Sequence, residues 1–597
     1  MAEPAPATLC ESFQRIVARI PTATAIGTPD GSVSYTWREY GEQVRKTAAA
    51  LAALGVRSGD TVAIMLTNRP EFHLVDTAVL HLGATPFSIY NTSAGEQIAH
   101  LFRNAGNRVV VCEEQFAERV LAVRETLADS AVEHVVCVDG QPEGTLRLDT
   151  VIDTAIAAAD PSFDFEASWR AVQPDSVATI IYTSGTTGPS KGVEITHANV
   201  LAQLDSIQRL TPSSEQDIVL SYLPDAHAAN RVGCQYLSLG TGLQIRTVAD
   251  PRTLINALAQ VRPTIFGGVP QIWYKIKTAI ETGVAAEPSP VKRRIAGWAL
   301  RTGTRVAELT SDRKPVRSRL RAQHALADRL VLQALRRKLG MDRVHSCVSG
   351  AAPIAPEALA FMLGLGIPVS EVWGMSELTA VVTANPRDGI RIGTVGIPVS
   401  GMQVKIAEDG EVLARGPQVM RGYRNDPEKT AETIDPDGWL HTGDIGSIDS
   451  DGYLRIVDRK KELIINAAGK NMSPSNIEGT IKAHCPLAGS VIAIGDNRKF
   501  VVALLTLDPE AAASYAGRHG LPDNSPKALH GQPSVVAEVA AGIEAANQRL
   551  SRVEQVKKFA VLPSVWEPGG DELTPTMKLK RKPISEKYRA EIDQLYT

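Results

Sequence analysis

The chain is 597 residues long, enough to bury a large hydrophobic core over several structural units without disulfides or a structural metal. Hydrophobic residues make up 44% and charged residues 22%, which excludes collagen, a coiled coil and a chain that is disordered throughout. The net charge of −3 shows no global basic excess, so we expect no nucleic-acid partner.

The cysteines and the first residues indicate a cellular location. The 6 cysteines are scattered and form no C-x-x-C pair, which favours a reduced cytosolic protein over metal or redox chemistry. Residues 1–14 lack the charged and apolar regions of a secretory signal, and no apolar run is long enough to span a membrane. We therefore expect a cytoplasmic protein.

Residues 1–180 alternate helix signals and strand signals. Thr36 and Glu39 form a capping box that predicts the start of a helix, and apolar residues at helical spacing continue it to Leu51. Apolar runs of strand length follow at 61–66, 109–112, 135–138 and 178–182. Strands separated by helical stretches predict βαβ units and a mostly parallel sheet, so we expect an α/β fold.

Residues 292–338 form a strongly basic segment. They hold fourteen Lys and Arg against three acidic residues, a local balance of +11 that leaves the rest of the chain at −14. Apolar residues such as Trp298 and Leu330 are interleaved, so we expect basic amphipathic helices. Two interpretations stay open: a solvated helical face, or a surface that contacts anionic lipid head groups or a polyphosphate ligand. The second would place the protein peripherally on the inner face of the membrane.

The pattern changes after residue 445. A turn signal at 449–452 predicts a hairpin, and the charged run 458–462 has the composition of an exposed interdomain hinge. Ser473 and Pro474 predict the start of a helix, as N-cap and first helical residue. A last helix is indicated by apolar residues at helical spacing: Ile584, Tyr588, Ile592 and Tyr596. We predict a small α+β domain of about 135 residues at the C-terminus.

The segment from Tyr182 to Gly192, YTSGTTGPSKG, has the composition of a phosphate-binding loop. It follows a predicted strand, and its three glycines, its hydroxyl side chains and its single lysine suit a loop that wraps phosphate oxygens. It is not a Walker A loop, because Lys191 is followed by Gly192 and not by the Ser or Thr that would hold Mg²⁺.

This loop and several later segments together resemble the adenylate-forming superfamily of acyl-CoA synthetases, luciferases and peptide-synthetase adenylation domains. The later segments, in chain order, are SGAAP, EVWGMSE, GWLHTGD, DRKKE, GKN and LTPTMK. The resemblance covers residues 30–590. It implies a large domain at 1–458, with mostly parallel sheets, helices and a small β-barrel-like subdomain. A small mobile α+β domain at 459–597 would follow, with a hinge near Lys461.

The resemblance implies a site for ATP and Mg²⁺, in which a carboxylate is aimed at the α-phosphorus. Glu377 would be the Mg²⁺ ligand, Trp373 would stack on adenine, and Asp444 would accept hydrogen bonds from both ribose hydroxyls. The implied ATP-binding residues are Thr183, Ser184, Gly185, Thr186, Thr187, Gly188, Lys191, Gly350, Ala351, Ala352, Glu371, Val372, Trp373, Gly374, Met375, Ser376, Asp444, Ile456 and Arg459.

Catalysis is implied for Lys578, Glu377 and Thr183. The register of TPTMK selects Lys578, which would bridge the attacking carboxylate and the α-phosphate as charge develops. In the second half-reaction the small domain would rotate about Lys461, and coenzyme A would enter past Gly469 and Lys470.

His227 and Gly374 are implied at the acyl site, where a glycine would leave open a channel that a bulky side chain would close. Asp225 and Val372 depart from the family's usual residues near this site. The GKNxxP pattern, the ELTPTMKLKRK ending and the helical insertion near 290–340 are similar to long-chain fatty acyl-CoA synthetases. We therefore predict an ATP-dependent long-chain fatty acid–CoA ligase that releases AMP and pyrophosphate.

Three alternatives remain open from the sequence. The acyl-adenylate could be passed to a carrier-protein phosphopantetheine. The acid could be sterol-like or aryl. A catalytically inactive nucleotide-binding or membrane-associated protein is the third.

Overall fold

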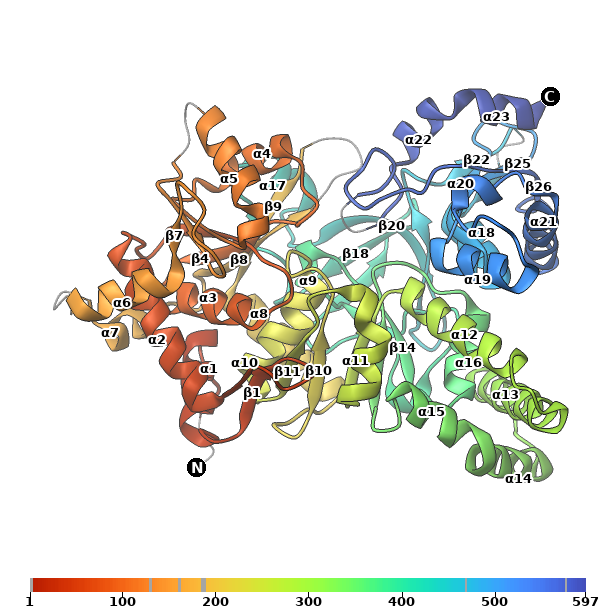
Figure 1. Ribbon diagram of the computed structural model, residues 1–597, viewed down its shortest axis with the longest axis horizontal. Helices are drawn as coiled ribbons and strands as arrows, with labels where there is room; N and C mark the ends of the chain where they lie inside the picture. The colour runs from red at the N-terminus through yellow and green to blue at the C-terminus, as the bar shows by residue number, and fades with distance from the viewer. Residues whose placement is uncertain (1–3, 128–130, 159–162, 184–188, 468–469, 575–576) are drawn as a thin grey trace.

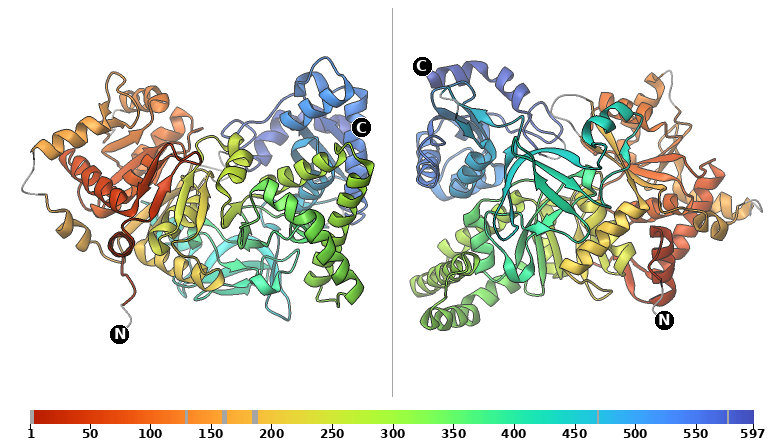
Figure 2. Two further views of the ribbon diagram at one scale, coloured as in Figure 1. Left: turned by 60° about the horizontal axis from the view of Figure 1, so that its bottom comes forward. Right: turned by 180° about the vertical axis from the view of Figure 1, so that it is seen from behind.

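The computed structural model describes residues 4–127, 131–158, 163–183, 189–467, 470–574 and 577–597 (Figure 1). Two large sheets with flanking helices form the N-terminal part, a smaller antiparallel sheet follows, and the C-terminal residues form a separate α+β unit (Figures 1 and 2). The predicted α/β fold class is confirmed.

The first large sheet has eight strands and is parallel except at one edge. The apolar runs predicted four of its parallel strands, β3, β5, β6 and β8, but not β4 and β7. The antiparallel pairs are β8·β9 and β9·β19. In spatial order the strands are β19 (Gly422–Tyr423), β9 (Lys191–Thr196), β8 (Val177–Thr183), β4 (Thr85–Ser88), β3 (Thr61–Met65), β5 (Val109–Cys112), β6 (His134–Cys137) and β7 (Leu146–Arg147).

The second large sheet has nine strands, and its central strands are parallel. In spatial order they are β16 (Ile397–Pro398), β15 (Thr383–Ala384), β14 (Val369–Trp373), β13 (Ser346–Ser349), β12 (Ile265–Gly268), β10 (Ile218–Ser221), β11 (Gln244–Thr247), β1 (Thr24–Gly27) and β2 (Ser34–Thr36). One hydrophobic core joins the two large sheets, because residues of β1, β3, β5, β9 and β11 pack in a single cluster.

The first predicted helix is confirmed. Thr36 and Glu39 form the predicted capping box, and the helix that they start runs over Trp37–Ala53. The longer helices of the N-terminal part are α1 (Leu9–Arg19), α2 (Trp37–Ala53), α3 (Pro70–His81), α4 (Gly95–Ala105), α5 (Glu114–Thr126), α6 (Leu148–Ala158), α8 (His197–Leu210), α11 (Leu254–Val261), α12 (Pro270–Ala285), α13 (Pro290–Ser311), α14 (Ser318–Ala327) and α16 (Pro356–Gly364). The shorter ones are α7 (Phe165–Arg170), α9 (Ala228–Asn230), α10 (Leu237–Thr241), α15 (Gln333–Leu339) and α17 (Pro427–Thr433). No helix among the described residues is long and apolar enough to cross a membrane.

The smaller sheet has four antiparallel strands and corresponds to the predicted β-barrel-like subdomain. Its strands are β17 (Gln403–Ile406), β18 (Glu411–Arg415), β20 (Leu440–Ile448) and β21 (Leu454–Arg459). The predicted hairpin at 449–452 joins β20 to β21, and Gly452 adopts the positive φ of 84° that the turn requires.

The C-terminal unit has its own core around a three-stranded sheet. Its strands are β24 (Ala488–Ile494), β25 (Val501–Leu507) and β26 (Val556–Val561), with a short pair β22 (Ile464–Ile465) and β23 (Asn471–Met472). Its helices are α18 (Pro474–His484), α19 (Pro509–His519), α20 (Pro526–Leu529), α21 (Pro533–Asn547), α22 (Arg581–Lys587) and α23 (Arg589–Tyr596). Ser473 caps α18 as predicted, because its hydroxyl accepts the Asn476 N–H at 3.0 Å.

The predicted last helix is divided into α22 and α23. The helix breaks at Tyr588, whose backbone lies at φ −104° and ψ 28°. The Tyr588 hydroxyl donates to Glu572 Oε1 at 2.9 Å and accepts the Trp566 indole N–H at 3.1 Å. These two contacts hold the buried Tyr588 side chain at the break between the two helices.

Candidate active site

The predicted phosphate loop connects two antiparallel strands. Thr183 ends β8 and pairs with Lys191, the first residue of β9. Ser184, Gly185, Thr186, Thr187 and Gly188 lie outside the described residues, so their phosphate contacts stay a prediction. The Lys191 ammonium lies 4.8 Å from the centroid of the Tyr423 ring, a cation–π contact. Desolvation lowers the pKa of Lys191, with a further contribution from the charge on Lys429.

Glu377 follows β14 and contacts the same tyrosine, Tyr423, as this lysine. It is buried in the short 3₁₀ turn Ser376–Leu378, and its Oε1 accepts a hydrogen bond from the Tyr423 hydroxyl at 2.9 Å. Among the described residues no group of three or more His, Cys, Asp and Glu side chains could hold a metal. One carboxylate together with substrate phosphates is a common way to bind Mg²⁺, and Glu377 near Lys191 fits it.

Asp444 is held by a hydrogen bond and an ion pair from two different strands. Its Oδ2 accepts the indole N–H of Trp373 at 2.8 Å, and its Oδ1 lies 2.8 Å from Nε of Arg459. Burial raises the pKa of Asp444, whereas Arg459, then Trp373 and Lys578 oppose this rise. The sequence placed these residues at the nucleotide but did not predict the Trp373–Asp444 bond, because no local pattern reports it.

Lys578 comes from the C-terminal unit and lies among charged groups of the N-terminal part. Its side chain keeps contact with solvent. Desolvation by surrounding protein is the largest influence and lowers its pKa, and Arg459 adds to this, while Asp444 and Glu377 raise it. The charge of Lys578 also lowers the pKa of His227. The structure thus brings together the predicted catalytic lysine, the predicted Mg²⁺ ligand and the predicted ribose carboxylate.

The segment Gly350–Ala352 follows β13 and lies next to Glu371 on β14. Glu371 is buried, and its Oε1 accepts only a long hydrogen bond, 3.4 Å, from the Ile354 N–H. Burial therefore raises its pKa to about 8. Ser349 Oγ, its neighbour across the sheet, is buried without a hydrogen-bond partner in the described part of the chain. The sequence assigned Glu371 to the ATP site, but it did not predict the burial of Glu371 or of Ser349.

The predicted acyl-site histidine begins a short helix. His227 is the N-cap of α9, and its Nδ1 accepts the Ala229 N–H at 3.1 Å. Burial, with a smaller contribution from Lys578, lowers the pKa of His227 to about 4. The ring is therefore neutral at neutral pH, and the accepting role of Nδ1 assigns the proton to Nε2.

The reasoning for Gly374 needs a correction. We expected this glycine to leave a channel open, but a Cβ added to Gly374 would lie 1.7 Å from the carbonyl oxygen of Ala380. The backbone of 380–381 fills that space, so the close approach of two backbone segments is what requires glycine here. The assignment of Gly374 to the acyl site stays a prediction. Its neighbours Val372, Met375 and Ser376 are partly exposed.

Asp225 belongs to a buried polar network between the two large sheets. Its carboxyl group accepts hydrogen bonds from Asn230 at 2.6 Å and Asn68 at 3.2 Å, and burial raises its pKa to about 8. Next to it, Arg231 and Asp76 form an ion pair with no solvent exposure. The sequence marked Asp225 only as a departure from the family's pattern. The network fixes the loop that carries the candidate acyl-site histidine.

Of the predicted hinge and coenzyme A residues, Lys461 and Lys470 are described. Lys461 is exposed in the turn after β21, and Ile456 lies within that strand. Lys470 is exposed, and its N–H donates to Asn466 Oδ1 at 2.9 Å. Gly469 lies outside the described residues. The hinge role and the domain boundary at 458/459 stay predictions.

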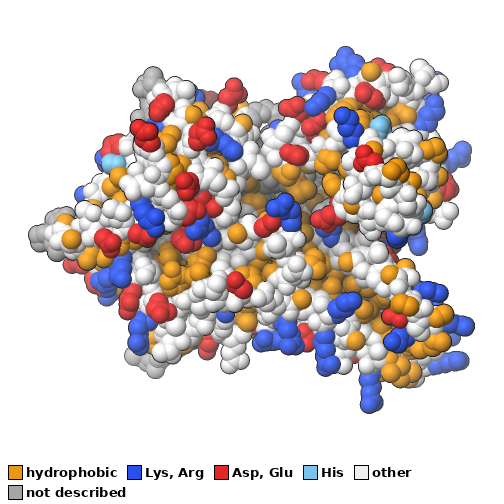
Figure 3. All heavy atoms as spheres, viewed as in Figure 1, with side chains coloured by type: hydrophobic (Ala, Val, Ile, Leu, Met, Phe, Trp, Pro, Cys, Tyr) orange, Lys and Arg blue, Asp and Glu red, His pale blue; other side chains and the backbone are white. Residues whose placement is uncertain are grey.

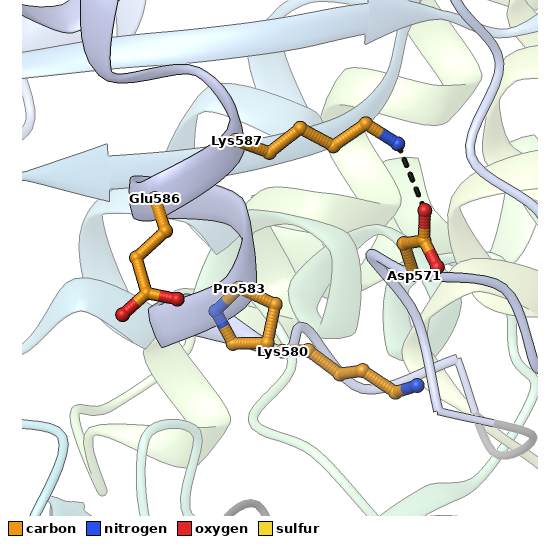
Figure 4. Close-up of a pocket in the computed structure, with 5 residues that line it drawn as sticks. All are labelled: Asp571, Lys580, Pro583, Glu586 and Lys587. Carbon is orange, nitrogen blue, oxygen red and sulfur yellow. Dashed lines mark hydrogen bonds and ion pairs between the residues drawn. The ribbon is translucent and has the colours of Figure 1, made fainter.

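A surface hollow in the C-terminal unit contains none of the predicted site residues. Its lysines already have partners: Lys587 Nζ lies 3.1 Å from Asp571 Oδ2, and Lys580 Nζ donates to the Gly570 carbonyl oxygen at 2.8 Å. The lining residues are Asp571, Lys580, Pro583, Glu586 and Lys587 (Figure 4). Because this hollow contains none of the predicted residues, we place the candidate active site where they gather, around Lys578, Glu377 and Asp444.

The chain belongs to the family of AMP-binding enzymes. The model of that family, described as AMP-binding enzyme, matches residues 13–424, and the model of its C-terminal domain matches residues 461–597. Within the family, the chain is similar to fatty-acid–CoA ligases. It is 54% identical over 454 residues to the putative fatty-acid–CoA ligase fadD11 of Mycobacterium tuberculosis, which covers 76% of this chain and 79% of that protein.

Two further relatives cover more of the chain. The long-chain-fatty-acid–CoA ligase FadD15 of Mycobacterium bovis is 34% identical over 94% of this chain and 92% of its own length. The long-chain-fatty-acid–CoA ligase ACSBG2 of Gallus gallus is 31% identical over 100% of this chain and 82% of its own length.

Solved structures share the fold. The anthranilate CoA ligase AuaEII in complex with anthranoyl-AMP superposes with a TM-score of 0.72 at 19% identity, over 98% of both chains. The O-succinylbenzoate CoA synthetase of Bacillus subtilis, in complex with ATP and magnesium ion, gives 0.66 at 20% identity, over 96% of this chain and 98% of that one. The adenylate-forming fold that the motifs implied is confirmed.

Proposed function

We propose that the protein activates a long-chain fatty acid with ATP and transfers the acyl group to coenzyme A. The first half-reaction forms an acyl-adenylate and releases pyrophosphate, and the second forms acyl-CoA and releases AMP. The observation that carries this proposal is the position of Lys578, which a separate domain holds close to Asp444 and Glu377. The long-chain fatty-acid–CoA ligases among the relatives support the choice of acid.

In the first half-reaction a carboxylate oxygen bonds to the α-phosphorus, and the bond from that phosphorus to the bridging oxygen of pyrophosphate breaks. Mg²⁺ held by Glu377 would neutralise charge on the phosphate oxygens. The chain's own contribution is positional and electrostatic. Asp444 would hold the ribose, Lys191 would face the phosphates, and Lys578 would stabilise the charge shared by the attacking oxygen and the α-phosphate.

In the second half-reaction the coenzyme A thiol loses its proton to solvent and its sulfur bonds to the acyl carbonyl carbon. The bond from that carbon to the phosphate oxygen of AMP breaks, and AMP leaves with the bonding electron pair. The Lys578 side chain must leave the active site so that the thiol can reach this carbon. The contacts between the N-terminal part and the C-terminal unit include an exposed ion pair, in which Lys275 Nζ lies 3.0 Å from Glu510 Oε2. Exposed ion pairs contribute about 1 kcal/mol or less, so a rotation near Lys461 costs little at this contact.

The test is direct product analysis. Purified protein is incubated with ATP, Mg²⁺, coenzyme A and a mixture of short- to long-chain acids, and acyl-CoA and acyl-AMP are measured by mass spectrometry. Long-chain acyl-CoA is expected, and chelation of Mg²⁺ should abolish it. Acyl-AMP without thioester would favour a carrier protein as acceptor, and the absence of both products with every acid would refute the proposal.

We also propose that the basic segment 292–338, which includes α13 and α14, contacts an anionic membrane surface. Ten of the fourteen Lys and Arg in residues 292–338 form no ion pair with a carboxylate within the described parts of the chain. Large apolar side chains lie exposed among them: Val291 is 66% exposed and Leu330 57%. Figure 3 shows basic and apolar side chains gathered over this region, at the lower right. Interleaved cations and exposed apolar groups suit a surface of anionic lipid.

Vesicle sedimentation tests this contact. Replacing Arg317, Arg319 and Arg321 with glutamine should weaken binding to vesicles that contain phosphatidylserine, because each basic residue contributes ~1 kcal/mol near such a surface. Phosphatidylcholine vesicles should show little binding in either case. A control with the same charge change on the C-terminal unit combines Arg518→Gln, Arg552→Gln and Arg589→Gln. Equal vesicle binding by the two triple variants would refute a membrane contact through the basic segment 292–338.

A further inference from the structure

Trp373 does more in this structure than present an aromatic face. Its indole N–H donates to Asp444 Oδ2 at 2.8 Å, across 71 positions of sequence, and both side chains are buried. Arg459 contacts the other oxygen, Oδ1, at 2.8 Å. One oxygen of this carboxylate is therefore held by a hydrogen bond and the other by an ion pair.

This arrangement leaves the carboxylate able to bind a sugar. Each carboxylate oxygen has two lone-pair directions, and the hydrogen bond from Trp373 uses one of those on Oδ2. With the contacts of the described residues, each oxygen keeps a direction that can accept one hydroxyl, which matches the two adjacent hydroxyls of a ribose. The hydrogen bond and the ion pair restrict rotation of the carboxylate, so less entropy is lost when the sugar binds.

The donor is specific to tryptophan at this position. An indole has an N–H on the edge of its five-membered ring, whereas phenylalanine has no donor and the tyrosine hydroxyl lies at the far end of the ring. Burial raises the pKa of Asp444, and the hydrogen bond from Trp373 acts against that rise together with the charges of Arg459 and Lys578. Loss of the indole N–H would leave one carboxylate oxygen of a buried group without its protein donor.

We propose that Trp373 is a positioning residue for the ribose carboxylate, and that it thereby sets the preference of the site for ribonucleotides over deoxyribonucleotides. The inference rests on the proposed nucleotide site, in which Asp444 faces the ribose. It adds to that site a residue that acts on the sugar through Asp444, in addition to any stacking on the base.

The test compares three nucleotides in binding experiments. Isothermal titration measures ATP, 2′-deoxyATP and 3′-deoxyATP against the full chain and against Trp373→Phe, with Mg²⁺ but without acid or coenzyme A. Trp373→Phe should weaken ATP binding by about tenfold, since a hydrogen bond to a charged group is lost. It should weaken binding of the deoxynucleotides much less, so the preference for ATP shrinks. An equal loss for all three nucleotides would show that Trp373 acts only on the base and would overturn the proposal.

A double-mutant cycle with Asp444→Asn gives an independent measure. If Trp373 acts through Asp444, the effects of Trp373→Phe and Asp444→Asn on ATP binding should be strongly non-additive. Additive effects would also overturn the proposal. Trp373→Tyr serves the same purpose if the phenylalanine variant does not fold. Because neither acid nor coenzyme A is present, failure of the proposed ligase reaction would leave these results unaffected.

Discussion

Replacing Lys578 with alanine should remove the first half-reaction and spare the second. In the structure the Lys578 ammonium is within electrostatic range of Glu377 and Asp444, where the reacting phosphate would lie. A unit charge about 4 Å from developing negative charge contributes ~4 kcal/mol at an effective dielectric constant of ~20, which corresponds to roughly 1,000-fold in rate. Because the side chain remains in contact with solvent, screening reduces this value, and we expect a loss of about 100- to 1,000-fold.

Two assays separate the half-reactions. Exchange of labelled pyrophosphate into ATP in the presence of acid measures adenylation. Release of AMP from supplied acyl-AMP on addition of coenzyme A measures thiolysis. Lys578→Ala should lose the exchange and keep thiolysis within a few-fold of the wild-type rate, because the lysine is used in only one domain orientation.

Lys580 provides the matched control. It stands two positions later in the same segment, but its ammonium donates to the Gly570 carbonyl oxygen at 2.8 Å within the C-terminal unit. Lys580→Ala should therefore leave exchange nearly unchanged. The reasoning is refuted if Lys578→Ala reduces both half-reactions equally, or if the two variants behave alike.

Asp76→Asn leaves the buried Arg231 guanidinium without its carboxylate and should lower the free energy of unfolding by about 3–5 kcal/mol. Denaturant titration measures this, and a loss below ~1 kcal/mol would contradict a structural role for the pair. Gly374→Ala should strongly reduce both thermal stability and pyrophosphate exchange, because its Cβ would meet the Ala380 carbonyl oxygen at 1.7 Å. Unchanged melting and exchange would show that this backbone contact is absent. Burial raises the pKa of Glu371 from 4.5 to about 8, so its contribution to stability is present below pH 4.5 and is lost as pH rises to about 8. Glu371→Gln should lack this part of the pH dependence of unfolding, and parallel profiles for the two proteins would argue against a buried, unpaired carboxyl group.

Local signals in the sequence were reliable for elements and motifs. The capping box of Thr36 and Glu39, the N-cap Ser473 and the hairpin before Tyr453 were all predicted from a few adjacent residues. Helix starts and tight turns depend on hydrogen bonds within three or four positions, so the sequence alone specifies them. The last helix was predicted less well, because the contacts of Tyr588 with Trp566 and Glu572 join different segments.

The features of the candidate active site also fall into two groups, those that the sequence predicted and those that only the structure revealed. The sequence by itself determined the family, the phosphate-loop motif and the identity of the residues expected to act, including Lys578 in the TPTMK register. Only the tertiary structure decided that Lys578 lies beside Glu377 and Asp444, and that Trp373 donates to Asp444. A motif specifies which side chains are present, whereas the distances between those side chains depend on how sheets and domains pack. Burial decides their protonation, because it removes the water that would otherwise stabilise the charged form.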